Sequence, residues 1–168
     1  DILWLDERAR IEVRELAHKL GTERIHRLTG RMPDLTPALY RMLWVLRNEP
    51  DVARRIDKFA DVQSYLVHRL AGGPLRTGWP SADPLGAFDL EKKEWSAPLL
   101  EALGITADRL PVAHRPGTEL GKVSAEAAAA TGLREGTPII AGGGDGQMAG
   151  LGTNCTSPER AYINLGTA

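Results

Sequence analysis

Apolar residues recur at helical spacing along much of the chain. In residues 8–20 they fall at Ile11, Leu16 and Leu20 within a charged segment that Gly21 ends. This pattern predicts an amphipathic surface helix. The same rule predicts further helices, at residues 37–48, 60–70, 95–103 and 125–131,.

The helix predicted at residues 60–70 carries Val62, Leu66 and Leu70 on one face. After it, residues 72–89 are rich in Gly, Pro, Ser and Asp, which predicts an extended loop,. A loop of this length inside a compact domain is more often functional, or packed on its own aromatic anchors, than idle.

Short apolar runs predict strands, at residues 1–6, 110–112, 122–124, 138–141 (buried) and 161–165,. Because free chain ends usually lie in frayed polar segments, a strand at each end predicts an internal piece of a longer protein. The alternative is a small complete domain that begins and ends with a strand. Helices and strands alternate, so the fold class is α/β.

The composition of the 168 residues is that of an ordinary globular protein, with 42% hydrophobic and 26% charged residues,. The 21 Lys and Arg nearly balance the 22 Asp and Glu, which argues against a nucleic-acid partner and an anionic membrane surface,. No apolar run approaches 18 residues, so no membrane span is expected. The single cysteine, Cys155, cannot form an internal disulfide, and the reducing cytoplasm is the default location,.

The strongest candidate for chemistry is the stretch of residues 139–152. It runs from an apolar strand through Gly142-Gly143-Gly144 to Asp145 and a short helix at residues 148–151. An ionised carboxylate at a helix start can accept a proton from a substrate hydroxyl, as the general base does in phosphoryl transfer to an alcohol. The alternative is that Asp145 only caps the helix by accepting a bond from a backbone N–H two or three residues on.

A dinucleotide-binding turn is a rival interpretation, because Gly144, Gly146 and Ala149 fit its loose pattern,. The negative charge of Asp145 would lie unfavourably near a pyrophosphate, and the next apolar strand, which ends at Leu165, carries no acid for a ribose,. No P-loop pattern occurs in the chain,.

Both ends of the chain carry further candidate ligand contacts. The turn at Gly166 and Thr167 can present backbone N–H groups and a hydroxyl to phosphate oxygens,. Trp4, Asp6 and Arg8 place an aromatic face, a carboxylate and a guanidinium at a strand tip, a set suited to a polyhydroxylated ligand. A core tryptophan beside a surface ion pair is the alternative. No metal-ligand spacing links the four histidines,.

In this order, the motifs resemble those of the FGGY family of carbohydrate kinases, which phosphorylate sugars and polyols with ATP. The segment Trp4-Leu5-Asp6-Glu7-Arg8 is similar to the family's W-x-D-x-R, and residues 37–50 resemble its P-x-x-K-x-x-W…N-x-P helix, with Arg41 in place of Lys. Further similar segments lie at residues 65–72, 132–138, 142–145 and 165–167. Departures from the family pattern occur at Ser64, Ala71 and Ala168.

The resemblance implies an actin-like ATPase (ribonuclease H-like) fold and a two-lobed sugar kinase. Residues 1–153 would form the latter part of the N-terminal sugar-binding lobe, and residues 154–168 the start of the C-terminal nucleotide-binding lobe. Asp145 matches the family's catalytic base, and Gly166 and Thr167 match its phosphate-binding turn. The residues expected on the sugar side are Trp4, Asp6, Arg8 and Gln147.

The expected function is ATP- and Mg²⁺-dependent phosphorylation of a sugar or polyol, with a pentulose such as xylulose favoured. This chain is expected to be an incomplete piece that does not turn over by itself, because phosphoryl transfer needs the full set of positioning groups. A catalytically silent sugar-binding or regulatory relative is the second hypothesis. A homodimer is compatible with either.

Overall fold

The structure is a computed structural model that describes residues 5–163 and residue 165. Its α-helices are α1 (Arg10–Leu20), α2 (Thr22–Thr29), α3 (Ala38–Asn48), α4 (Pro50–Ala53), α5 (Val62–Ala71), α6 (Trp79–Ala82), α7 (Ala97–Leu103), α8 (Ala125–Thr131) and α9 (Asp145–Gly152). Its strands are β1 (Arg76–Gly78), β2 (Phe88–Asp89), β3 (Glu94–Trp95), β4 (Val112–His114), β5 (Glu119–Lys122) and β6 (Pro138–Ile140). Two 3₁₀ turns are η1 (Asp83–Leu85) and η2 (Ala107–Arg109).

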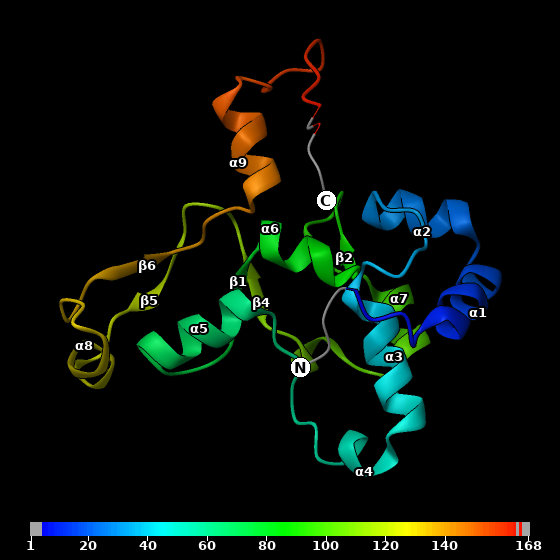
Figure 1. Ribbon diagram of the computed structural model, residues 1–168, viewed down its shortest axis with the longest axis horizontal. Coiled ribbons are helices and arrows are strands. Elements are labelled where there is room, and N and C mark those ends of the chain that lie inside the picture. The colour runs from blue at the N-terminus through cyan, green and yellow to red at the C-terminus, as the bar shows by residue number, and fades with distance from the viewer. Residues whose placement is uncertain (1–4, 164, 166–168) are drawn as a thin grey trace.

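The main hydrophobic core lies among helices α1, α2, α3 and α7, which group together on one side of the molecule (Figure 1). Leu16, Ile25, Leu39, Leu43 and Leu99 meet there, each nearly inaccessible to solvent. Burial of large aliphatic side chains of this kind supplies most of the stabilisation of a fold. The helical part is therefore the stable platform of the chain.

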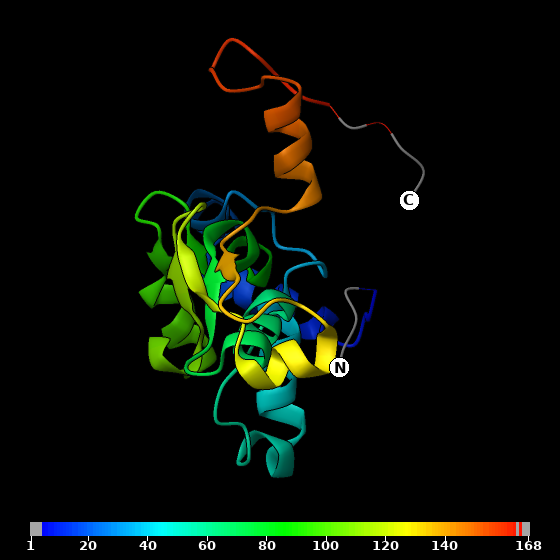
Figure 2. The same cartoon turned by 90° about the vertical axis from the view of Figure 1, so that its left-hand side faces the viewer.

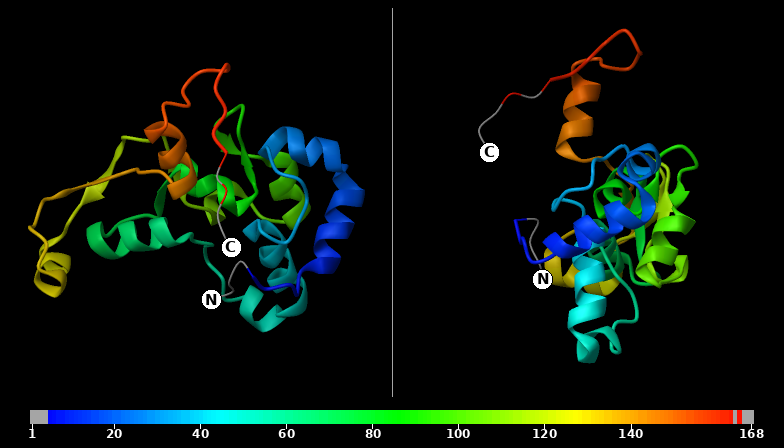
Figure 3. Two further views of the ribbon diagram at one scale, coloured as in Figure 1. Left: turned by 45° about the horizontal axis from the view of Figure 1, so that its top comes forward. Right: turned by 90° about the vertical axis from the view of Figure 1, so that its right-hand side faces the viewer.

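A second, smaller core holds the other side of the molecule together. Val67 of α5 packs there with Leu120 of β5 and Ala141, which directly follows β6. Strands β5 and β6 are antiparallel, with Lys122 opposite Pro138. This arm, with α8 at its far end, lies well away from α1 in the views of Figure 1 and Figure 3. Helix α5 thus supports the strand that leads to the glycine-rich turn.

The sheets of the described residues are short, and one of them joins distant parts of the chain. Strands β1 and β4 are parallel, with Arg76 opposite Val112 and Gly78 opposite His114. Strands β2 and β3 are antiparallel, and Phe88 and Trp95 pack edge to face at a ring distance of 5.4 Å. The prediction of an extended loop at residues 72–89 is therefore wrong, because this segment contains β1, α6, η1 and β2.

The five long helices of the sequence prediction are confirmed, with ends that shift by at most two residues. Three helices were not predicted: α2, α4 and α6. Gly21 ends α1 with a positive φ of 84°, yet α2 begins at the next residue and buries Ile25. Pro50 ends α3 and also opens α4, because proline is well suited to the first turn of a helix,.

Two predicted buried faces are wrong in detail. Val62 and Leu66 are 76% and 50% exposed, while Ser64 and Val67 of the same helix are buried. Ile11 is exposed and Glu12 is buried in α1. In both helices, the face that packs against neighbouring elements is rotated by one position from the face that the apolar residues predict.

The predicted strands agree less well. The strand at residues 138–141 forms as β6, but Ile140 is 48% exposed and only Ala141 is deeply buried, because β6 has one covered face. Ala161–Ile163 and Leu165 form no strand, and Ile163 is exposed without a neighbouring strand to pair with,. Leu5 and Asp6 form no strand either. Residues 1–4 and Asn164 lie outside the described residues, so those parts of the two terminal strands stay predictions.

Helix α9 projects from the body of the molecule, with its first residues at the base (Figure 2). None of the helices in the described residues is long and apolar enough to cross a membrane.

Candidate active site

The glycine-rich turn connects β6 to α9 and presents a carboxylate at the start of the helix. Asp145 is the first residue of α9, after Gly144 in the N-cap position. Its side chain is exposed, and Oδ1 accepts a hydrogen bond of 2.8 Å from the backbone N–H of the next residue, Gly146. The predicted alternative of a capping bond to an N–H two or three residues on is not what the structure shows. The carboxylate is open to a ligand.

Gln147 follows two residues after Asp145 in α9, and its side chain lies over the glycine turn. A Cβ atom placed on Gly144 would lie 2.5 Å from Gln147 Oε1, so the side chain of Gln147 folds back onto the turn. Asp145 and Gln147 thus both lie in the first turn of α9, and their roles stay predictions. A carboxylate and a neighbouring amide can together hold a hydroxyl group, one as acceptor and the other as donor or acceptor.

The chain just before the turn is firmly held. The backbone N–H of Ala141 donates to Thr118 O, and Ala141 O accepts from Gly117 N–H, both at 2.8 Å. Its side chain is 2% exposed, in the small core with Val67. Ala141 is therefore the last anchored residue before Asp145, four positions on.

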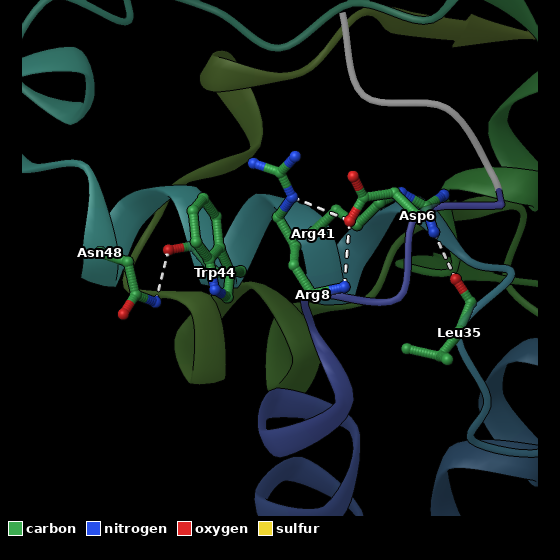
Figure 4. Close-up of polar contacts among 6 residues, drawn as sticks. All are labelled: Asp6, Arg8, Leu35, Arg41, Trp44 and Asn48. Carbon is green, nitrogen blue, oxygen red and sulfur yellow. Dashed lines mark hydrogen bonds and ion pairs between the residues drawn. The ribbon is translucent and has the colours of Figure 1, made fainter.

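The other predicted pair, Asp6 and Arg8, forms a polar cluster with α3 (Figure 4). Asp6 Oδ1 accepts from Arg8 Nε at 2.8 Å and from Arg8 N–H at 3.0 Å. The Arg8 guanidinium lies 4.7 Å from the centre of the Trp44 ring, a cation–π contact,. The bond from Arg8 lowers the pKa of Asp6, and the bond to Asp6 raises the pKa of Arg8.

Helix α3 supplies the remaining contacts of this cluster (Figure 4). The buried Arg41 guanidinium donates to Leu35 O and, at 2.8 Å, to Thr36 O. Its burial lowers the pKa of Arg41, while the nearby charge of Asp6 opposes that shift. Asn48 Nδ2 donates to Trp44 O at 2.9 Å. The motif residues around Trp44 thus hold the segment before α1 against α3, a contact that spacing alone did not reveal.

A cavity of about 340 Å³ lies beside Arg41, between the starts of α3 and α5. Thr36, Ser81 and Asp61 contribute polar groups to its lining. Asp61 Oδ1 accepts from Ser64 N–H, while Oδ2 is buried without a hydrogen-bond partner among the described residues. Hydroxyl, guanidinium and carboxylate groups around one cavity suit a small hydroxylated ligand.

The structure does not bring all the predicted site residues together. In the described part of the chain, no hydrogen bond or ion pair joins Asp6 or Arg8 to Asp145 or Gln147. Trp4, Gly166 and Thr167 lie outside the described residues, and their roles stay predictions.

The described residues contain no group of three or more His, Cys, Asp or Glu side chains that could hold a metal ion. Mg²⁺ in kinases is commonly held by one or two carboxylates together with substrate phosphates. Asp145 alone does not make such a site.

Residues 1–152 match the N-terminal domain of the FGGY family of carbohydrate kinases. The chain belongs to this family. It is 33% identical over 156 residues to an autoinducer-2 kinase of Escherichia coli strain K12, and 35% identical over 166 residues to one of Yersinia enterocolitica. These alignments cover 93% and 97% of this chain but only 29% and 31% of the relatives, so the chain spans less than a third of their length.

Solved structures of FGGY kinases have the same fold. The chain is 30% identical to the xylulose kinase of Rhodospirillum rubrum, with a TM-score of 0.84 over 94% of this chain and 32% of that one. For the gluconate kinase of Lactobacillus acidophilus the values are 27% and 0.82, over 91% of this chain and 31% of that one. The predicted family and the α/β, actin-like fold class are confirmed.

Proposed function

We propose that the protein containing this chain transfers the γ-phosphoryl group of ATP to a hydroxyl group of a small sugar or polyol. The observation that carries the proposal is the exposed Asp145 carboxylate at the end of the glycine turn of an FGGY kinase domain. Family membership favours this interpretation of the turn over a dinucleotide-binding one.

Asp145 is the proposed general base. Its carboxylate accepts the proton of the substrate hydroxyl as the hydroxyl oxygen bonds to the γ-phosphorus. The bond between that phosphorus and the bridging oxygen breaks, and ADP leaves. Catalysis of this reaction depends mainly on positioning and charge stabilisation. We propose that the anchored Ala141 and the short glycine turn contribute by holding the carboxylate in place.

Gln147 is proposed to bind a second hydroxyl group of the substrate, since its exposed side chain lies over the glycine turn in the first turn of α9. Trp4, Asp6 and Arg8 are proposed to border the sugar from the other side. The ion pair with Arg8 and the Trp44 contact already engage Asp6 and Arg8, so we infer that they act mainly by fixing the chain next to Trp4.

The nucleotide side is proposed to begin near the end of the chain. Residues 1–153 would belong to the sugar-binding lobe and residues 154–168 to the start of the nucleotide-binding lobe, which agrees with a family match that ends at residue 152. Gly166 and Thr167 are the proposed phosphate contacts. ATP binds with Mg²⁺, which neutralises phosphate charge when bound. The cytoplasm is the proposed location.

For the substrate we propose a small polyhydroxylated compound, with two leading candidates. Similarity to autoinducer-2 kinases, at 33–35% identity, supports autoinducer-2. Similarity to a xylulose kinase, at 30% identity with a TM-score of 0.84, supports xylulose.

The test is a coupled assay of ADP release by the intact protein with each of four compounds: autoinducer-2, xylulose, gluconate and glycerol. ADP release that depends on one of them supports the proposal and names the substrate. Sugar binding by calorimetry with no ADP release and no ATP binding would instead identify a catalytically silent relative.

A further inference from the structure

We propose that Gln63 is a positioning residue for Asp145, acting through the end of strand β1 and the glycine turn. The inference rests on the proposed function for its kinetic part, while its structural part stands on its own. Gln63 is the second residue of α5 and was not among the residues that the sequence pattern singled out.

The side chain of Gln63 holds the end of β1 by two hydrogen bonds. Its Oε1 accepts from the backbone N–H of Gly78 at 2.6 Å and from Thr77 Oγ1 at 3.2 Å. Thr77 and Gly78 are buried, so these donors have no access to water as a replacement. A buried donor that loses its acceptor is costly, and the pair of bonds therefore fixes α5 relative to β1.

Gly78 in turn lies directly against the start of the glycine turn. A Cβ atom at Gly78 would lie 3.3 Å from both Ala141 Cβ and Gly142 O, and 3.2 Å from Gln63 Oε1. The close approach of these segments leaves no room for a side chain. Gln63, Gly78 and Gly142 therefore form a continuous packed contact from α5 to the turn.

The rest of the surroundings reinforces this contact. Val67, one turn along α5 from Gln63, packs against Ala141 in the small core. The backbone bonds of Ala141 to Gly117 and Thr118 hold it as well. Ala141 and Gly142, which these contacts hold in place, form the mount of the glycine turn. Asp145 follows three residues after Gly142. Because the carboxyl ends of parallel strands commonly border ligand sites in α/β sheets, the end of β1 is a suitable place for this mount.

A displacement at the mount is expected to move the carboxylate that follows it. A misplacement of about 1 Å can cost about 100-fold in rate when a reacting group must be aligned. Removal of the Gln63 acceptor, or a methyl group at Gly78, shifts the mount by a few tenths of an ångström. We expect kcat to fall about 10-fold for either change, with the KM for the sugar altered less than kcat.

The experiment uses Gln63→Met and Gly78→Ala in the intact protein, with two readouts. Gly78 has φ −87° and ψ 154°, which alanine adopts freely, so this variant adds only crowding. The first readout is amide hydrogen exchange in residues 138–148, which should become at least several-fold faster in both variants. Gln63→Glu keeps the acceptor oxygen and should retain slow exchange. Gly152→Ala, whose methyl would meet no atom within 4 Å, is the control for an added methyl group.

The second readout is kcat in a double-mutant cycle with Asp145→Asn. If Gln63 acts through Asp145, Gln63→Met should cause little further loss once Asp145 is replaced. Unchanged exchange in residues 138–148, or losses that multiply in the double variant, would overturn the proposal. If Asp145→Asn alone has no effect on kcat, the base assignment fails, and the exchange result still decides whether Gln63 holds the turn.

Discussion

Replacement of Gly86 by alanine should destabilise the helical platform, because two effects coincide at this residue. Gly86 has a φ of 78°, a conformation that alanine adopts only with strain,. A Cβ atom there would lie 2.5 Å from Pro37 Cβ, which precedes α3, and 3.4 Å from Leu39 Cδ2. Atoms of this kind normally lie about 3.5–4.0 Å apart, so one backbone segment must move by about 1 Å.

The chain offers a control that separates the two effects. Gly104 has a similar φ of 71°, but a Cβ atom there would meet nothing within 4 Å. Gly104→Ala should therefore cost about 1 kcal/mol, from the backbone strain alone. Gly86→Ala should cost about 2–4 kcal/mol, since overpacking in a filled interior adds about 1–3 kcal/mol.

Urea unfolding of the intact protein, followed by tryptophan fluorescence, measures the difference, because Trp44 and Trp95 pack against the main core. The expected result is a clearly lower midpoint for Gly86→Ala than for Gly104→Ala. Equal midpoints for the two variants would show that Pro37 moves aside at no cost, and would refute the close packing of η1 against α3.

Three further predictions concern pH and capping. Burial raises the pKa of Tyr40 to about 12, so the contribution of Tyr40 to stability should be full below pH 10 and lost between pH 10 and 12,. The free energy of unfolding of Tyr40→Phe, measured over the same pH range, should not show this loss. The bond from Arg8 lowers the pKa of Asp6 from 3.8, so the stabilisation is present above that value, and the stability gap between the wild type and Asp6→Asn should close as the pH falls below about 4,. Ser124 Oγ accepts from Ala127 N–H at 3.1 Å, and Ser124→Ala should cost about 1 kcal/mol and speed amide exchange in residues 125–131,.

The helices were predictable because their signals are local. Apolar spacing, the glycines at positions 21, 72 and 104, and the alanine run at residues 125–131 all act within one or two turns,. The exposed Val62 and Leu66 show the limit of this reasoning, because the buried face of α5 is decided by Leu120 and Ala141 from distant segments.

The short strands could not be predicted for a related reason. Strand β1 pairs with β4, which lies more than 30 residues further along the chain, and two or three residues give no periodic signal,. Pairing over such a distance is determined by the packing of everything between the strands.

The same difference between local and distant contacts applies to the candidate site. The Asp145 turn was predictable because the strand, glycines, acid and helix follow one another directly in the sequence. The contact of Gln63 with Gly78 was not, since the residues are fifteen positions apart and meet only once α5 lies on β1. The stacking of Arg8 on Trp44 likewise joins two motifs that spacing alone leaves separate.

The most direct test of the central proposal is the kcat of Asp145→Asn in the intact protein, with the sugar that best supports ADP release. The sugar Kd should stay within a few-fold of the wild-type value, while kcat falls about 100-fold or more, because a general base is lost without a change of shape. Asp51→Asn removes an exposed carboxylate from α4 and should leave kcat unchanged. If kcat for Asp145→Asn stays within a factor of a few of the wild type, Asp145 is not the base, and the proposed mechanism is contradicted.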